Sequence, residues 1–191
     1  MENNASYREL QELVASGDSK SLETMAFKIG NIVLEEGIFP GDRFAAILAI
    51  LKEEQFQFFD GSWKLIRVFE ENWKYLSEEQ RTALLPVLEA HYEYFSDWMA
   101  CFVISGILGE LYKDERAFEA LRRLEDCRKD VPRSFVPHGL EHIVCDSSDA
   151  ELAMRALSEL TKMQKDGSAI VRDEVTESLA RLKKRQSSKP S

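Results

Sequence analysis

Hydrophobic residues return every three or four positions along almost the whole chain, and no convincing run alternates between apolar and polar residues. This spacing is typical of amphipathic α-helices, whose apolar side chains lie along one face. Residues that favour turns, such as Gly17, Gly37 and the pair Asp60-Gly61, separate the apolar runs. The connections between runs are short and leave little room for a sheet. The pattern therefore predicts an all-α fold.

Several helix ends are marked by local signals. Ser77 with Gln80 three positions later predicts a capping box, in which each side chain binds the other residue's backbone N–H. Ser19 or Ser21 is expected to cap the helix that ends near Gly37. Pro86 and Pro137 each lie inside a helical pattern, where proline is expected to bend the helix.

Four segments carry apolar residues at one common spacing of plus five, plus four and plus three positions. They are Phe39, Phe44, Leu48, Leu51; Met99, Ile104, Leu108, Leu111; Val131, Val136, Leu140, Ile143; and Ile170, Val175, Leu179, Leu182. The last three segments start 32 and 39 residues apart, in the range of helical repeats. We therefore expect an α-α superhelix of about ten helices in antiparallel pairs. An irregular helical bundle is the alternative.

The last repeats resemble HEAT repeats in their residues. Their second helices follow an aspartate turn, begin with Val131-Pro132-Arg133 or Ile170-Val171-Arg172, and close on a small residue followed by leucine. The run Leu84–Leu88, with Pro86 at its centre, is similar to a HEAT first helix. The resemblance is best over residues 78–184 and implies a HEAT/ARM-like solenoid. From the length of the chain and the composition of its end, we expect one domain over residues 1–184, followed by a flexible basic tail, 185–191.

Composition places the chain among globular proteins, with 191 residues, 44% hydrophobic and 31% charged. No run of eighteen apolar residues occurs, and the N-terminus is polar, so we expect neither a membrane span nor a secretory signal. The three cysteines, Cys101, Cys127 and Cys145, are too few and too widely spaced for a disulfide framework. These features predict a cytoplasmic protein that does not act on membranes.

The net charge of −9 is concentrated in one segment. Residues 53–98 hold ten acids and four bases, a net −6, together with eleven of the nineteen aromatic residues. An acidic surface repels phosphate backbones and attracts basic proteins, so we predict a basic protein partner and no direct binding of nucleic acid. Aromatic residues surrounded by acids suit such an interface. The candidate partner-binding residues are Asp60, Glu70, Glu71, Trp73, Tyr75, Glu89, Tyr92, Glu93, Tyr94 and Asp97.

Signatures of catalysis are absent from the sequence. There is no glycine-rich phosphate loop, nucleophile elbow, His-Glu-x-x-His helix or Cys-x-x-Cys pair. His138, His142 and Cys145 share one helix face and are a weak candidate for zinc, because no fourth ligand is nearby and two histidines on an ordinary helix face explain the pattern better. We therefore predict no metal, no cofactor and no enzymatic activity.

A small, acidic, all-helical chain without chemistry of its own resembles the immunity proteins of bacterial contact-dependent inhibition and related polymorphic toxin systems. This resemblance implies that the protein neutralises a basic toxin domain, typically a nuclease, by covering its active site. The alternative is a general HEAT-repeat scaffold or adaptor in an intracellular assembly. A HEAT-like base-excision enzyme is disfavoured because such enzymes grip DNA with a basic surface.

Overall fold

The computed structural model describes residues 5–187, nearly all of them in helices and none of them in a β-strand. The predicted all-α fold is confirmed. Contacts between Cα atoms divide the chain into two compact units, Met1–Val103 and Ile104–Ser191, and the boundary falls inside one helix, α7 (Trp98–Gly106). The expected single domain over residues 1–184 stays a prediction, and the two units are described separately below.

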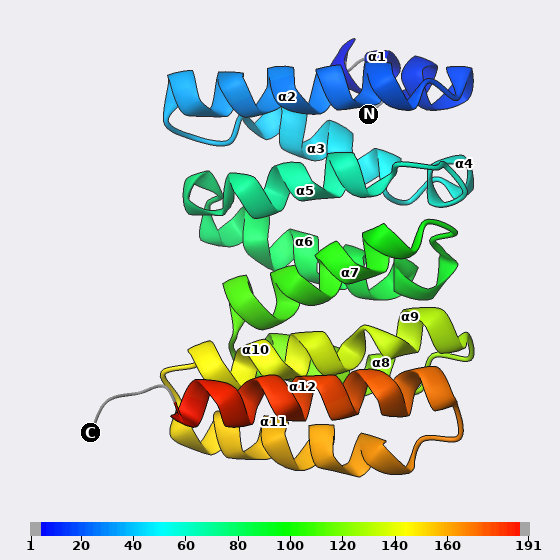
Figure 1. Cartoon of the computed structure of the whole chain (residues 1–191). Coiled ribbons are helices and arrows are strands. Elements are labelled where there is room, and N and C mark those ends of the chain that lie inside the picture. Colours follow the sequence, from blue (N-terminus) through cyan, green and yellow to red (C-terminus); the bar gives the residue numbers. More distant parts are fainter. Residues whose placement is uncertain (1–4, 188–191) are drawn as a thin grey trace. The chain divides into compact units, whose positions relative to one another are not determined.

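Unit 1 consists of short helices joined by tight turns (Figure 1). Its elements are α1 (Ala5–Ser16), α2 (Ser19–Glu36), α3 (Gly41–Ile50), α4 (Glu54–Gln57), α5 (Trp63–Glu71), the 3-10 turn η1 (Trp73–Tyr75), α6 (Glu78–His91), the 3-10 turn η2 (Tyr92–Tyr94) and the first part of α7.

The core of unit 1 lies between α2, α3 and α5. Helix α2 packs on α5 and α1, and α3 packs on α1 and α6. A cluster of Phe39, Phe44 and Phe69 fills the centre, with ring centroids 5.5–6.1 Å apart. Helix α2 lies at one edge of the unit, at the top of Figure 1, so only one of its faces is covered by the rest of unit 1.

Unit 2 is built around one central helix, α10 (Val136–Asp146), which packs on its neighbours on several sides (Figure 1). The other elements are the π-helix η3 (Ile107–Tyr112), α8 (Glu115–Leu124), α9 (Asp130–Ser134), α11 (Ala150–Lys162), the 3-10 turn η4 (Met163–Lys165) and α12 (Ala169–Ser187). Helix α12 includes the first three residues of the predicted tail, and residues 188–191 lie outside the described part.

Two glycines let α10 approach the end of α7 and η3 closely. A Cβ atom at Gly109 would collide with the backbone of Gly139. A Cβ atom at Gly139 would lie 2.7 Å from Leu121 Cδ2 and 2.9 Å from the carbonyl oxygen of Ser105. Both distances are too short for real contacts, so this crossing requires glycine on both sides.

The repeated apolar spacing is only partly an inward-facing pattern. The second position of each set, Phe44, Ile104, Val136 or Val175, is buried. The first positions Val131 and Ile170 are 44% and 43% exposed, and the third set spans two helices, α9 and α10. The spacing therefore marks helices correctly, while the superhelical arrangement stays a prediction.

Most helix ends follow the predicted signals, with two corrections. The capping box of Ser77 and Gln80 is present, and Gly37 ends α2 in the left-handed conformation with φ 68°. Asp18, rather than Ser19 or Ser21, caps α2 and accepts hydrogen bonds from the N–H groups of residues 20 and 21. Pro137 lies in the first turn of α10, where its missing N–H costs nothing, whereas Pro86 does lie inside α6.

Candidate protein-binding surface

Two turns of unit 1 are joined by hydrogen bonds at the end of α6. The N–H and hydroxyl of Ser96 both donate to the carbonyl oxygen of Gln57, at 2.9 and 3.3 Å. One carboxylate oxygen of Asp97 accepts from the N–H of Gly61 at 2.7 Å, and the other accepts from the N–H of Met99 at 3.0 Å. Gly61 has φ 92°, a conformation that other residues rarely adopt. The turn after α4 is therefore held against the start of α7.

Three aromatic side chains lie exposed beside this junction. Phe58, Tyr94 and Trp98 are 60%, 48% and 54% exposed, although large aromatic residues are usually at least half buried. The carboxylates of Asp60, which is exposed, and of Glu93 and Asp97, which are half-buried, come from the same two turns. We call Phe58, Asp60, Glu93, Tyr94, Asp97 and Trp98 the loop-end surface.

The expectation for Tyr92 is wrong. Tyr92 is fully buried, and its carbonyl oxygen accepts a hydrogen bond from the thiol of Cys101 at 3.3 Å. The reason is the 3-10 turn η2, which has three residues per turn and sends residues 92 and 94 to different sides. Tyr92 therefore belongs to the core, and only Tyr94 of this pair reaches the surface.

Four other predicted residues, Glu70, Glu71, Trp73 and Tyr75, lie near the opposite end of α6. Helix α6 has 14 residues, so its two ends are about 20 Å apart. The ten predicted residues therefore do not form one patch. Glu89, half-buried on the last turns of α6, lies toward the loop-end side.

The group at the start of α6 is already paired with bases. Arg67 lies 3.8 Å from Glu70 and 2.9 Å from Glu71, measured from its Nε to the carboxylate oxygens. The Arg81 guanidinium lies over the Trp73 ring at 4.9 Å, and Lys74 Nζ lies over the Tyr75 ring at 4.7 Å. These contacts compensate the charges and cover the aromatic faces, so this group is the weaker candidate for a basic partner.

Phe58 and Trp98 belong to the loop-end surface, although the sequence did not single them out as site residues. Helix α7 explains why Trp98 was missed, since Trp98–Gly106 contains no charged residue and has no polar face to orient it. Phe58 follows buried Phe56 and Gln57 in a four-residue helix, too short for a periodic pattern. The one available signal was the density of aromatic residues between 56 and 98.

The histidine cluster on α10 is not arranged as a metal site. The rings of His138 and His142 meet edge to face at 4.7 Å, and His142 Nδ1 lies 3.0 Å from Asp146 Oδ2. Burial, aided by His142 and Arg181, lowers the pKa of His138 to about 4. Within the described residues, no three His, Cys, Asp or Glu side chains are grouped to hold a metal ion.

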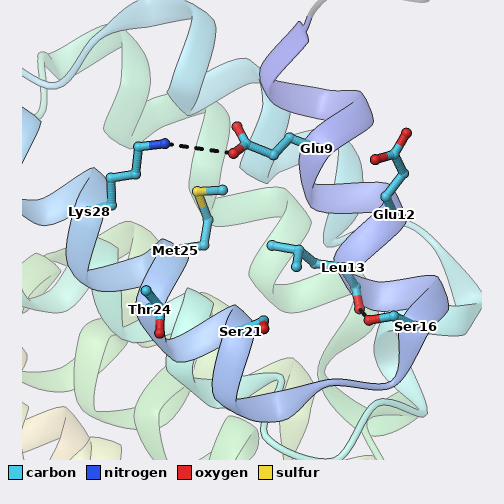
Figure 2. Close-up of a pocket in the computed structure, with 8 residues that line it drawn as sticks. All are labelled: Glu9, Glu12, Leu13, Ser16, Ser21, Thr24, Met25 and Lys28. Carbon is cyan, nitrogen blue, oxygen red and sulfur yellow. Dashed lines mark hydrogen bonds and ion pairs between the residues drawn. The ribbon is translucent and has the colours of Figure 1, made fainter.

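An open groove of about 400 Å³ lies between α1 and α2 (Figure 2). Leu13 and Met25 lie between the two helices, and the ion pair of Glu9 and Lys28, 3.7 Å long, crosses one end. The hydroxyls of Ser16 and Thr24 donate to backbone carbonyl oxygens at 2.7 and 3.0 Å. Its eight lining residues include the ionisable groups of Glu9, Glu12 and Lys28 and no histidine or cysteine.

No family model, curated protein or solved structure matches the chain. No helix within residues 5–187 is both long and apolar enough to cross a membrane.

Proposed function

We propose that the chain is a non-enzymatic binding protein whose loop-end surface docks a basic protein. The observation that carries the proposal is the exposure of Phe58, Tyr94 and Trp98 beside three carboxylates. Trp and Tyr are the side chains that most often dominate binding energy at protein interfaces. Carboxylates around them raise the rate of encounter with a basic partner.

We further propose that the partner is a toxin domain and that the chain is its immunity protein. A domain that cleaves RNA or DNA needs a basic site, and carboxylates placed over that site imitate phosphates. The loop-end surface offers the exposed carboxylate of Asp60 for this purpose, while Asp97 is occupied by two N–H groups. A scaffold or adaptor role remains the alternative, and it requires no neutralised activity.

We also propose that unit 2 and the end of unit 1 derive from HEAT-like repeats over residues 78–184. Contacts within unit 2 support this. Arg133, from the start of one predicted second helix, binds the carboxylate of Asp166, from the next aspartate turn, at 3.0 and 3.2 Å. Arg172, at the corresponding place in the last repeat, donates to the carbonyl oxygen of Asp166 at 2.6 Å.

The test is co-expression with any adjacent toxin-like reading frame, followed by measurement of binding. Trp98→Ala should weaken binding by about 10- to 100-fold, as expected for truncation of a central aromatic residue. Asp60→Lys combined with Glu93→Lys should mainly slow association. The matched control, Glu70→Lys with Glu71→Lys, reverses the same number of charges at the other end of α6 and should bind normally.

The outcomes of these experiments separate the immunity role from the scaffold role. Protection of cells together with loss on Trp98→Ala supports the immunity role. Binding of a basic protein without any protection supports the scaffold role. Equal losses from the loop-end variants and from the control would show that the loop-end surface is not the interface.

A further inference from the structure

Gln57 joins the turn after α4 to the end of α6 and to the start of α7. It is 6% exposed, and its carbonyl oxygen accepts hydrogen bonds from the N–H and the hydroxyl of Ser96 at 2.9 and 3.3 Å. Its side-chain nitrogen Nε2 lies 2.7 Å from His91 Nδ1 and 3.4 Å from the carbonyl oxygen of Leu51. The contacts of this one buried residue therefore hold the turn after α4 against both sides of η2.

The exposed rings of the loop-end surface adjoin this junction. Phe58 directly follows Gln57, and Trp98 lies two positions after the serine that binds the carbonyl oxygen of Gln57. The rings of His91 and Tyr94 have their centroids 6.4 Å apart, within the range of aromatic contact. A change at His91 is therefore transmitted to the exposed rings over very few residues.

The hydrogen bonds of the junction select the neutral form of His91. The carbonyl oxygen of Leu51 can only accept, so the atom of the Gln57 amide beside it is the nitrogen. The same nitrogen donates to His91 Nδ1, which therefore carries no proton. In the protonated ring two N–H groups would face each other. Turning the amide over would instead place its oxygen against the Leu51 carbonyl, so either orientation loses one hydrogen bond.

The surroundings of His91 also oppose its protonation. Burial, followed by the positive charge of Lys52 in the turn after α3, lowers the pKa of His91 from 6.5. The acids of the neighbouring elements do not outweigh these two effects; they are Glu53, Glu54, Glu89 and Glu93. Because the folded pKa is the lower one, the stabilisation from the neutral ring is fully present above pH 6.5 and is lost as the pH falls through the lowered pKa.

We propose that His91 makes the loop-end surface sensitive to pH. The neutral ring holds the turn after α4 in place through Gln57, and protonation releases that turn together with the exposed rings beside it. Histidine is the one side chain whose ordinary pKa lies between pH 5 and 8, and His91 is the one histidine in residues 1–103. The inference goes beyond the proposed function, because it concerns the surface itself and does not depend on the partner.

The test is nuclear magnetic resonance of the full chain, without a partner, from about pH 8 to about pH 5. The hydrogen exchange of the Ser96 amide, corrected for its intrinsic pH dependence, reports the bond to Gln57. Its protection should fall by about 5- to 10-fold, as expected for the loss of one buried hydrogen bond. The indole N–H resonance of Trp98 should shift with the midpoint of the His91 ring titration. The indole of Trp73, at the opposite end of α6, is the internal control and should not follow that midpoint.

Two substitutions at His91 separate the acceptor from the titrating group. His91→Asn provides a side-chain oxygen that can take the place of Nδ1 and does not titrate, so the Ser96 amide should stay protected at both ends of the pH range. His91→Ala removes the acceptor and should show the low protection at both ends. His142→Asn, in unit 2, is the matched control and should respond to pH as the original protein does. Circular dichroism checks that each variant keeps its helices.

Three results would overturn the proposal. The first is a His91 ring that stays neutral down to about pH 5. The second is a ring that titrates without any change at Ser96 and Trp98, and the third is a pH response that persists in His91→Asn. None of these results bears on whether a basic protein docks on the loop-end surface, and a failure to find such a protein leaves the response of His91 unchanged. The two proposals therefore fail separately.

Discussion

Glu125 makes the stability of unit 2 depend on pH in an unusual direction. Its side chain is half-buried at the end of α8, and the oxygen Oε1 is inaccessible to solvent and has no hydrogen-bond partner. Burial, followed by the negative charge of Glu159, raises the pKa of Glu125 from 4.5 to about 7. Arg122 and Lys162 oppose this shift only partly. The fold therefore favours the protonated form.

The sign of the effect follows from the two pKa values. Stabilisation from the protonated carboxyl is fully present below the unfolded pKa of 4.5 and is lost as the pH rises through about 7. The complete shift corresponds to at most about 3.4 kcal/mol, at 1.36 kcal/mol for each pKa unit. Solvent screening of a half-buried group reduces this to about 1–2 kcal/mol.

Replacing the carboxyl with a neutral group of the same shape isolates this contribution. Glu125→Gln should match the original protein in free energy of unfolding at pH 4.5 and exceed it by about 1–2 kcal/mol at pH 8.5. Urea unfolding followed by circular dichroism reports both units, while tryptophan fluorescence reports unit 1 alone, because Trp63, Trp73 and Trp98 all lie there. Glu151→Gln, an exposed residue on α11, provides the baseline for removing a carboxylate.

The result that would refute this reasoning is a difference between Glu125→Gln and the original protein that stays constant, within about 0.5 kcal/mol, from pH 4.5 to 8.5. Glu159→Gln gives an independent check. Since the charge of Glu159 contributes to the raised pKa, that variant should move the loss of stability to lower pH. An unchanged pH dependence would assign the shift to burial alone.

Three further predictions concern the same units. His138 should give stability the opposite pH dependence, because its pKa is lowered from 6.5 to about 4. Its contribution to the free energy of unfolding is present above pH 6.5 and is lost, by up to about 3 kcal/mol, as the pH falls toward 4. His138→Asn should remove this loss, and acid titration followed by circular dichroism measures it. Gly139→Ala should destabilise the protein by about 1–3 kcal/mol in urea unfolding, because the added Cβ atom clashes with the carbonyl oxygen of Ser105. Gly30→Ala should stabilise the protein by about 0.5–1 kcal/mol, because the nearest atom, Asn72 Nδ2, is 3.6 Å away. Equal effects of the two substitutions would contradict the steric argument. Arg133→Met should lower the free energy of unfolding by about 1–3 kcal/mol, because Asp166 and the carbonyl oxygen of Cys127 each lose a charged hydrogen-bond donor. A thermal midpoint unchanged by the substitution would show that Arg133 does not contribute to stability.

Local rules predicted the helices of this protein well, because they depend on residues close together in sequence. The capping box of Ser77 and Gln80 and the stop at Gly37 both involve neighbours within one turn. The cap of α2 was misassigned because Asp18, Ser19 and Ser21 are all competent caps, and only the chain direction before the helix decides among them. Pro137 was placed inside a helix because the apolar pattern runs without interruption from α9 into α10.

Which side of a helix faces outward was harder to predict when a segment is apolar all round or only one turn long. Tyr92 and Tyr94 have the same chemistry, and the 3-10 geometry of η2 alone separates the buried ring from the exposed one. The spacing of apolar residues on α7 does not indicate whether Trp98 faces the core or the solvent. The candidate site was therefore predictable in its segment and its chemistry, but not residue by residue.

Charge density along the sequence overstates the acidity of any one face in unit 1. Several acids of residues 53–98 are occupied: Glu53 accepts a hydrogen bond from Tyr7, Glu71 pairs with Arg67, and Asp97 holds two turns together. The remaining acids are divided between the two ends of α6. An attractive field acts through uncompensated charges near the contact, and salt screens those farther away than about 10 Å at ordinary ionic strength. A basic partner at the loop-end surface therefore responds mainly to the few acids near it, such as exposed Asp60, and its association rate should fall with salt much less steeply than a net charge of −9 suggests.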